Sequence, residues 1–224
     1  DTCRVLVPSL RYSIEDSRSE IGDTGLRGRL RLSSEARRGA DAPTPERSYT
    51  PPMESIPTRH RAHDALGLLA QCRPGFEADA GQELQASPTR LAAAVHGQPQ
   101  SGFVFLALEQ ALPHDELRRR LDVSRLVFAR QSCQVLAVID DLPERDRLTP
   151  LVQRIEGFQE RFSALLLETP DTNEGKQQSG FLRRFGPLLE AALGKAGCLR
   201  PDSPHLPRLH VFFVGARQVW LGVS

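Results

Sequence analysis

From residue 65 onwards, apolar residues follow two different spacings along the chain, one typical of strands and one of helices. The order of the strands and helices indicated in this way predicts the fold. Short apolar runs bounded by glycine, proline or polar residues are typical of buried strands, whereas apolar residues three or four positions apart indicate helices. The first elements predicted in this way are a strand, a helix, two strands, a helix and one long or two short strands, at Leu66–Cys72, Phe76–Gln85, Leu91–Val95, Gly102–Leu108, Leu112–Leu121 and Ser124–Ile139. This β-α-β-β-α-β order is that of the ferredoxin-like fold.

A second α/β segment follows. We expect Thr149 to cap a helix that has Pro150 at its first position, and Pro187 to kink the longest helix or to mark a later start for it. The predicted elements are a helix, a strand, the longest helix and a β-hairpin, at 149–158, Ser163–Glu168, Thr172–Lys195, and Leu209–Val214 with Gln218–Val223. The predicted fold class is α/β (α+β), with subdomains at residues 63–142 and 143–224.

In residues 1–62 the apolar residues follow neither the strand spacing nor the helix spacing over any length, and the segment is rich in arginine and proline. A segment of this composition buries too little apolar surface to offset the entropy that it would lose on ordering. The chain also begins at Asp1, and Met53 is its only methionine. We therefore expect residues 1–62 to be disordered or a non-native extension, in a fragment or in a reading frame extended upstream of Met53.

Composition narrows the class of protein. Hydrophobic residues make up 39% of the chain and charged residues 25%, as in ordinary globular proteins, and no apolar run approaches the roughly 20 residues of a membrane span. The net charge of +1 indicates no particular partner, so a nucleic-acid contact would have to rest on local basic patches. The cysteines are too widely spaced for a zinc motif and indicate reduced cytosolic thiols, at Cys3, Cys72, Cys133 and Cys198.

Sequence motifs for catalysis or cofactor binding are absent. The chain has no Gly-x-Gly-x-x-Gly after a strand, no Gly-x-Ser-x-Gly elbow, no phosphate-binding loop and no His-Glu-x-x-His. The six histidines are dispersed, so no metal site is predicted. Trp220 and the phenylalanines have the spacing of core residues, which makes stacking on bases the less favoured interpretation.

Seven short segments occur in a recognisable order and together cover about residues 66–224. They are Cys72–Glu77, Phe128–Gln131, Asp146–Pro150, Asp171–Glu174 with Lys176, Arg183–Phe185, the helix end Leu188–Cys198, and His210–Phe213. In these segments the chain resembles the RlmM family of bacterial 23S rRNA cytidine 2'-O-ribose methyltransferases. Residues 1–62 do not share in this resemblance.

The resemblance implies a ferredoxin-like subdomain followed by a THUMP subdomain, an α/β module that holds RNA. In the family a Rossmann-like domain comes next, which binds S-adenosylmethionine and transfers the methyl group with a Lys-Asp-Lys-Glu type tetrad. No cofactor or catalytic residue of that domain can be placed before Ser224, so we expect the chain alone to be inactive. We also expect a monomeric cytoplasmic protein that binds 23S rRNA and neither DNA nor membranes.

Basic side chains of the folded segment are the candidates for RNA contact, because lysine and arginine neutralise phosphates and release counterions. Lys176, Arg183 and Arg184 lie on or near the polar side of the longest predicted helix. If that helix begins near residue 172, they occupy its early turns and can join backbone N–H groups in holding a phosphate. The alternative is a solvated helix face. For Arg73, after the first strand, the alternative is an ion pair with Glu77 or another acid.

Two further candidates lie elsewhere in the folded segment. Asn173 can hydrogen-bond a ribose or phosphate, while Asp171 or Thr172 beside it is expected to cap the helix. Arg130 interrupts an apolar run, which indicates either an RNA contact or a structural ion pair. A protein-interaction or adaptor domain is the alternative function, because ferredoxin-like folds serve many purposes.

Overall fold

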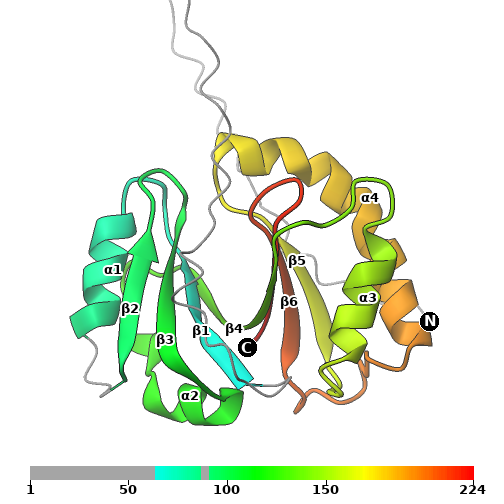
Figure 1. The fold of residues 1–224 in the computed structure, drawn as a ribbon, viewed down its shortest axis with the longest axis horizontal. Coiled ribbons are helices and arrows are strands. Elements are labelled where there is room, and N and C mark those ends of the chain that lie inside the picture. Colours follow the sequence, from blue (N-terminus) through cyan, green and yellow to red (C-terminus); the bar gives the residue numbers. More distant parts are fainter. Residues whose placement is uncertain (1–63, 87–90) are drawn as a thin grey trace, which may run out of the picture. The chain divides into compact units, whose positions relative to one another are not determined.

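A computed structural model of the chain describes residues 64–86 and 91–224. The expectations for residues 1–62 lie outside the described residues. The α-helices and strands are, in chain order (Figure 1), β1 (Asp64–Gln71), α1 (Glu77–Ala86), β2 (Ala93–Gly97), β3 (Phe103–Pro113), α2 (His114–Arg120), β4 (Gln131–Ile139), α3 (Leu148–Glu156), β5 (Ala164–Glu168), α4 (Asn173–Lys195), β6 (Arg208–Phe213) and β7 (Val219–Val223).

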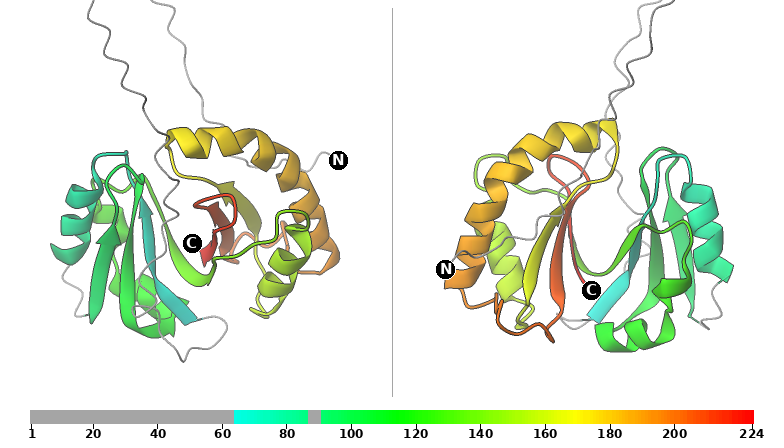
Figure 2. Two further views of the ribbon diagram at one scale, coloured as in Figure 1. Left: turned by 45° about the horizontal axis from the view of Figure 1, so that its top comes forward. Right: turned by 180° about the vertical axis from the view of Figure 1, so that it is seen from behind.

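The first four strands form the antiparallel sheet of a ferredoxin-like fold. Their order is β2-β3-β1-β4, and each neighbouring pair is antiparallel. Helix α1 packs against β2 and β3, as both views in Figure 2 show. The ferredoxin-like arrangement predicted from the order of the elements is therefore confirmed.

Among the boundaries in this part that differ from the prediction are the starts of α2 and β4. The helix expected from Leu112 begins only at His114, because β3 continues to Pro113 and Leu112 pairs with Ala65 of β1. Pairing along a neighbouring strand here outweighs the local helical pattern. The segment Ser124–Ile139 contains a single strand, which starts at Gln131 after a short 3₁₀ turn at Val123–Arg125.

The later strands continue the same sheet. Strand β5 pairs in parallel with β6, β6 forms the predicted antiparallel hairpin with β7, and β7 pairs antiparallel with β4. The result is a seven-stranded sheet of order β2-β3-β1-β4-β7-β6-β5. A division into subdomains near residue 142 therefore corresponds to no break in the sheet, and it stays a prediction.

Two apolar clusters occupy the two faces of this sheet, because successive residues of a strand point to opposite sides. Val104 and Leu106 belong to the larger cluster, which includes side chains from all the α-helices of the described chain. Phe103 and Phe105 point the other way, into a smaller cluster that contains no helix residue, with Trp220 of β7 packed edge-on against both rings. The smaller cluster thus joins β3 to β7 without any helix.

Helix α4 begins with the cap that the sequence predicts. The Thr172 hydroxyl accepts the N–H of Gly175 at 3.1 Å, and a Cβ on Gly175 would lie 1.9 Å from the carbonyl oxygen of Pro170, so only glycine fits there. Pro187 lies within the helix, and the ribbon of α4 bends along its course (Figure 1). Of the two outcomes expected for Pro187, the later helix start is wrong, because α4 already begins at Asn173.

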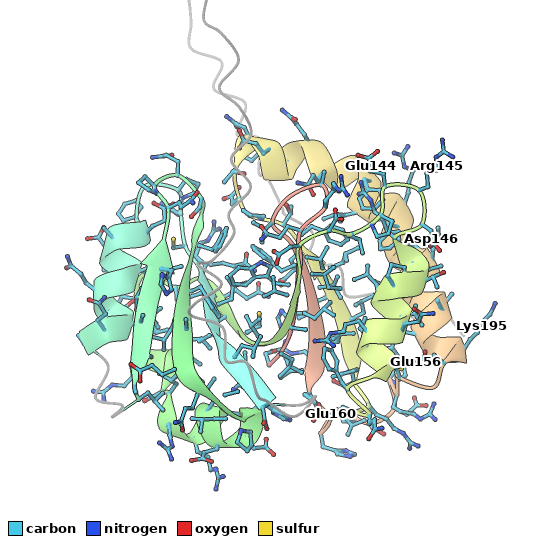
Figure 3. All side chains as sticks on the ribbon, in the orientation of Figure 1. Glu144, Arg145, Asp146, Glu156, Glu160 and Lys195 are labelled. Carbon is cyan, nitrogen blue, oxygen red and sulfur yellow. The ribbon has the colours of Figure 1, made fainter. Side chains whose placement is uncertain are left out.

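Helix α3 is capped by a different residue from the one predicted. Thr149 lies inside the helix, and its backbone N–H donates to the Asp146 carboxylate at 3.1 Å. Asp146 is labelled in Figure 3 just before α3. This hydrogen bond lowers the pKa of Asp146. The expectation that Thr149 caps the helix is wrong, because the Asp146 carboxylate accepts the backbone N–H of Thr149 and so supplies the cap itself.

A polar contact also connects the earlier and later elements. The Nε2 atom of His114, at the start of α2, lies 3.2 Å from a carboxylate oxygen of Glu160, between α3 and β5. The hydrogen bond to Glu160 raises the pKa of His114 above its ordinary value. Together with the β4–β7 pairing, this contact fixes the two halves of the sheet to each other.

Candidate nucleic-acid interface

The loop between β5 and α4 brings together two of the predicted RNA-binding cations. Asp171 in this loop accepts from the Arg130 guanidinium at 3.0 Å and lies 3.7 Å from the Lys176 ammonium. Both cationic side chains remain about half exposed, at 51% and 52%. One carboxylate therefore orients two positive groups toward solvent and leaves one of their two charges uncompensated.

Arg130 forms an ion pair and is still half exposed to solvent. It lies just before β4, where its backbone N–H donates to the carbonyl of Gln71 at 2.8 Å. The expectation of an ion pair is confirmed by the contact with Asp171. The pair is solvent-exposed, so its contribution to stability is only about 0–1 kcal/mol, and the guanidinium stays accessible to a ligand.

Arg183 and Arg184 are separated from the helix start that Lys176 occupies. They are the eleventh and twelfth residues of α4, roughly 15 Å from its first turn. Both are exposed and form no ion pair within residues 64–86 and 91–224. Lys176 and Arg183 are seven residues apart and so lie on one face of the helix, about 10 Å from each other. The expectation that these side chains occupy the early turns of the helix is therefore wrong for Arg183 and Arg184, and it holds for Lys176.

Asn173 and Arg73 are both exposed. Asn173 is the first residue of α4, and the capping role beside it belongs to Thr172. The alternative of an ion pair between Arg73 and Glu77 is wrong, because the Glu77 carboxylate accepts the backbone N–H groups of Gly75 at 2.9 Å and Gly102 at 2.8 Å. Arg73 is thus a free cation in the part of the chain that the structure describes.

Comparisons with known proteins match the chain in two segments. The family described as "Ribosomal RNA large subunit methyltransferase M, N-terminal" matches residues 146–224, and the "RlmM ferredoxin-like domain" matches residues 66–133. The chain belongs to the RlmM family. The ferredoxin-like match covers β1 to the start of β4, and the N-terminal match covers α3 to β7. Every residue of the candidate interface therefore lies in one of the two matched segments.

Curated relatives carry the name of the same family. "Ribosomal RNA large subunit methyltransferase M" of Thauera aminoaromatica is 46% identical over 160 residues, which are 70% of this chain and 44% of that protein. Its namesake in Aromatoleum aromaticum is 41% identical over 171 residues, 75% of this chain and 46% of that protein. The chain therefore spans about half the length of the curated relatives that it matches.

Solved structures give a weaker likeness. TrmN from Thermus thermophilus has a TM-score of 0.40 and 20% sequence identity, over 70% of this chain and 44% of that one. That likeness is too weak to bear on function.

Sequence reasoning missed a buried polar network in this RlmM chain. On the helix-free face of the sheet, Glu168 accepts from the side-chain amides of Gln131 and, at 3.4 Å, of Gln71. A second Glu168 contact joins its carboxylate to Nδ1 of His210 at 2.9 Å, and Nε2 of His210 lies 2.8 Å from the Ser224 hydroxyl. A histidine within an apolar run was its only signal in the sequence. With His210 1% exposed, the network ties strands together and offers no surface for RNA.

The thiols of the described chain are unsuited to nucleophilic chemistry. Cys72, Cys133 and Cys198 are free and buried. Burial raises the pKa of each, to about 11 for Cys72, where the charge of Glu77 adds to the effect. Protonated thiols are poor nucleophiles and metal ligands, and the described residues hold no cluster of three or more His, Cys, Asp or Glu suited to a metal ion.

The described helices also bear on membrane contact. None of those in residues 64–86 and 91–224 has the length and apolar character needed to cross a bilayer.

Proposed function

We propose that this chain holds ribosomal RNA for a 23S rRNA cytidine 2'-O-ribose methyltransferase. Residues 63–142 form its ferredoxin-like subdomain and residues 143–224 a THUMP-type RNA-binding subdomain. The protein acts as a cytoplasmic monomer, with 23S rRNA as its partner and without contacts to DNA or membranes. The alternative of a protein-interaction adaptor has no observation in its favour.

The row of exposed cations along α4 and its preceding loop carries this proposal. Lys176 and Arg183 share one helix face, and Arg184 lies beside them. Arg130 is held next to Lys176 by their common partner Asp171. Positive groups spaced along one face of a helix can contact successive phosphates of an RNA backbone. Each such contact releases counterions and so increases the affinity for RNA.

Replacing Lys176, Arg183 and Arg184 together by alanine is expected to weaken binding to rRNA fragments by about ten- to a hundredfold at 0.1 M salt. Each lost phosphate contact reduces the slope of log affinity against log salt by roughly 0.7–0.9, so the loss of three contacts should reduce the slope by about 2–3. The measurement is fluorescence anisotropy of labelled rRNA fragments over a salt series. Circular dichroism on the same samples checks that the fold is kept, since all three side chains are exposed.

A matched control is available on α2. Arg118, Arg119 and Arg120 are also exposed, and replacing them by alanine removes the same three charges from a different helix. This variant should bind RNA nearly as well as the parent chain. Equal losses in the two triple variants would contradict the α4 site and indicate only a general effect of net charge.

We further propose that the S-adenosylmethionine site of the whole protein lies in the part of the relatives with which this chain does not align. The 224-residue chain should then bind no S-adenosylmethionine in a calorimetric titration and transfer no methyl group to rRNA. The reason is chemical, because the chain has no glycine-rich loop after a strand to receive the cofactor. Measurable binding heat or methyl transfer by the isolated chain would contradict this assignment.

A further inference from the structure

Two phenylalanine rings are exposed side by side, although their spacing in the sequence suggests core residues. Phe76 precedes α1 and Phe128 precedes β4, and their ring centroids are 6.0 Å apart with an interplanar angle of 25°. Phe76 is 44% exposed and Phe128 37%, and Val127 beside them is 81% exposed. The prediction that the phenylalanines are core residues is therefore wrong for this pair, which we call the Phe76–Phe128 stack.

The backbone under the stack is fixed on both sides. The N–H of Phe76 donates to the carbonyl of Arg73 at 3.0 Å in a turn. The N–H groups of Val127 and Phe128 both donate to the carboxylate of Glu83 on α1, the latter at 3.0 Å. The rings are thus presented to solvent by an ordered backbone, so little entropy would be lost if a ligand packed on them.

Cations flank the stack, and the acids near it are occupied. Arg73 lies three residues before Phe76, and Arg130 lies two residues after Phe128. The backbone N–H of Arg130 donates to the carbonyl of Gln71, which brings the two arginines to neighbouring strand ends. The carboxylates of Glu77 and Glu83 accept backbone N–H groups instead of pairing with these arginines. Arg130 pairs with Asp171, and its side chain is still 51% exposed.

We propose that the Phe76–Phe128 stack binds an unpaired RNA base, with Arg73 and Arg130 contacting the phosphates on either side. This inference rests on the proposed function and extends it to single-stranded RNA. A base within a duplex has both faces covered by its neighbours, whereas an unpaired base can stack on an aromatic side chain. The two rings already contact each other, so the base continues the stack from its exposed side.

The test replaces both rings by leucine, which keeps an apolar surface and removes the aromatic faces. The full chain is titrated with a labelled, unstructured single-stranded oligoribonucleotide and with a blunt RNA duplex of the same length. We expect Phe76→Leu with Phe128→Leu to bind the single strand about tenfold more weakly, with an unchanged salt slope and unchanged duplex binding. The matched pair Phe76→Tyr with Phe128→Tyr should stay within about twofold of the parent, because it keeps the aromatic faces.

A second measurement does not depend on loss of binding. Phe76→Trp places an indole in the stack, and the chain's one native tryptophan, Trp220, is buried. Fluorescence of the new indole should be quenched when the single strand binds, and it should not respond to the duplex.

The outcomes separate this inference from the proposed function. If the parent chain binds single-stranded RNA but the leucine pair binds equally well, or the indole signal does not change, the stacking site is refuted and the proposed function stands. If the parent chain binds no RNA at low salt, both proposals fall.

Discussion

Replacing Trp220 by alanine is expected to lower the free energy of unfolding by about 3–5 kcal/mol. Trp220 is 1% exposed, and its ring centroid lies 4.8 Å from that of Phe105 and 5.9 Å from that of Phe103. These contacts join β7 to β3 across the helix-free face, where no helix side chain can move in to fill the space. The cavity left by the indole should therefore stay largely open, which adds to the lost transfer free energy.

Urea denaturation followed by far-ultraviolet circular dichroism measures this loss, because the variant lacks the native fluorophore. Trp220→Phe should cost clearly less, since a phenyl ring keeps part of the edge-on packing. Leu188→Ala provides the surface control, because Leu188 is 61% exposed and its loss should cost about 0.5 kcal/mol or less. A Trp220→Ala variant as stable as the Leu188→Ala variant would show that the smaller cluster does not hold the sheet together.

The ferredoxin-like half was predictable because its signals are local. The strand at Leu66–Cys72 and the helix after Phe76 each show a clear period within a few residues, and the order of elements then leaves few topologies. The end of β3 was not predictable in this way. Leu112 joins a strand because Ala65, far away in the sequence, pairs with it, and no pattern near Leu112 contains that information.

In the candidate interface, too, local features could be predicted from the sequence and contacts between distant residues could not. Lys176 and Arg183 could be placed on one helix face from their spacing alone. The contact of Arg130 with Asp171 joins residues 41 positions apart, so the sequence left open which acid Arg130 would meet. The Phe76–Phe128 stack depends in the same way on Glu83 holding the distant segment at Val127, and the spacing of the phenylalanines suggested burial.

The polar network around Glu168 leads to the second large prediction. Glu168→Ala is expected to destabilise the fold by about 3–5 kcal/mol, because it leaves one buried and two half-buried partners without the group that satisfies them. Those partners are His210 on β6, Gln131 on β4 and Gln71 on β1, the last of them 97 positions away. One carboxylate thus accepts hydrogen bonds from side chains on three strands. Its removal should therefore cost more stability than the loss of a single hydrogen bond.

A double-mutant cycle tests whether the network acts as a unit. Glu168→Leu and His210→Leu are each expected to cost several kcal/mol in urea denaturation, since each removes a hydrogen bond from the buried group that remains. The double variant removes both polar groups together and should cost less than the sum of the two single variants, by about 1–3 kcal/mol. Strictly additive losses would mean that the 2.9 Å contact between Glu168 and His210 contributes no coupling. Glu168 and His210 would then stabilise the fold independently of each other.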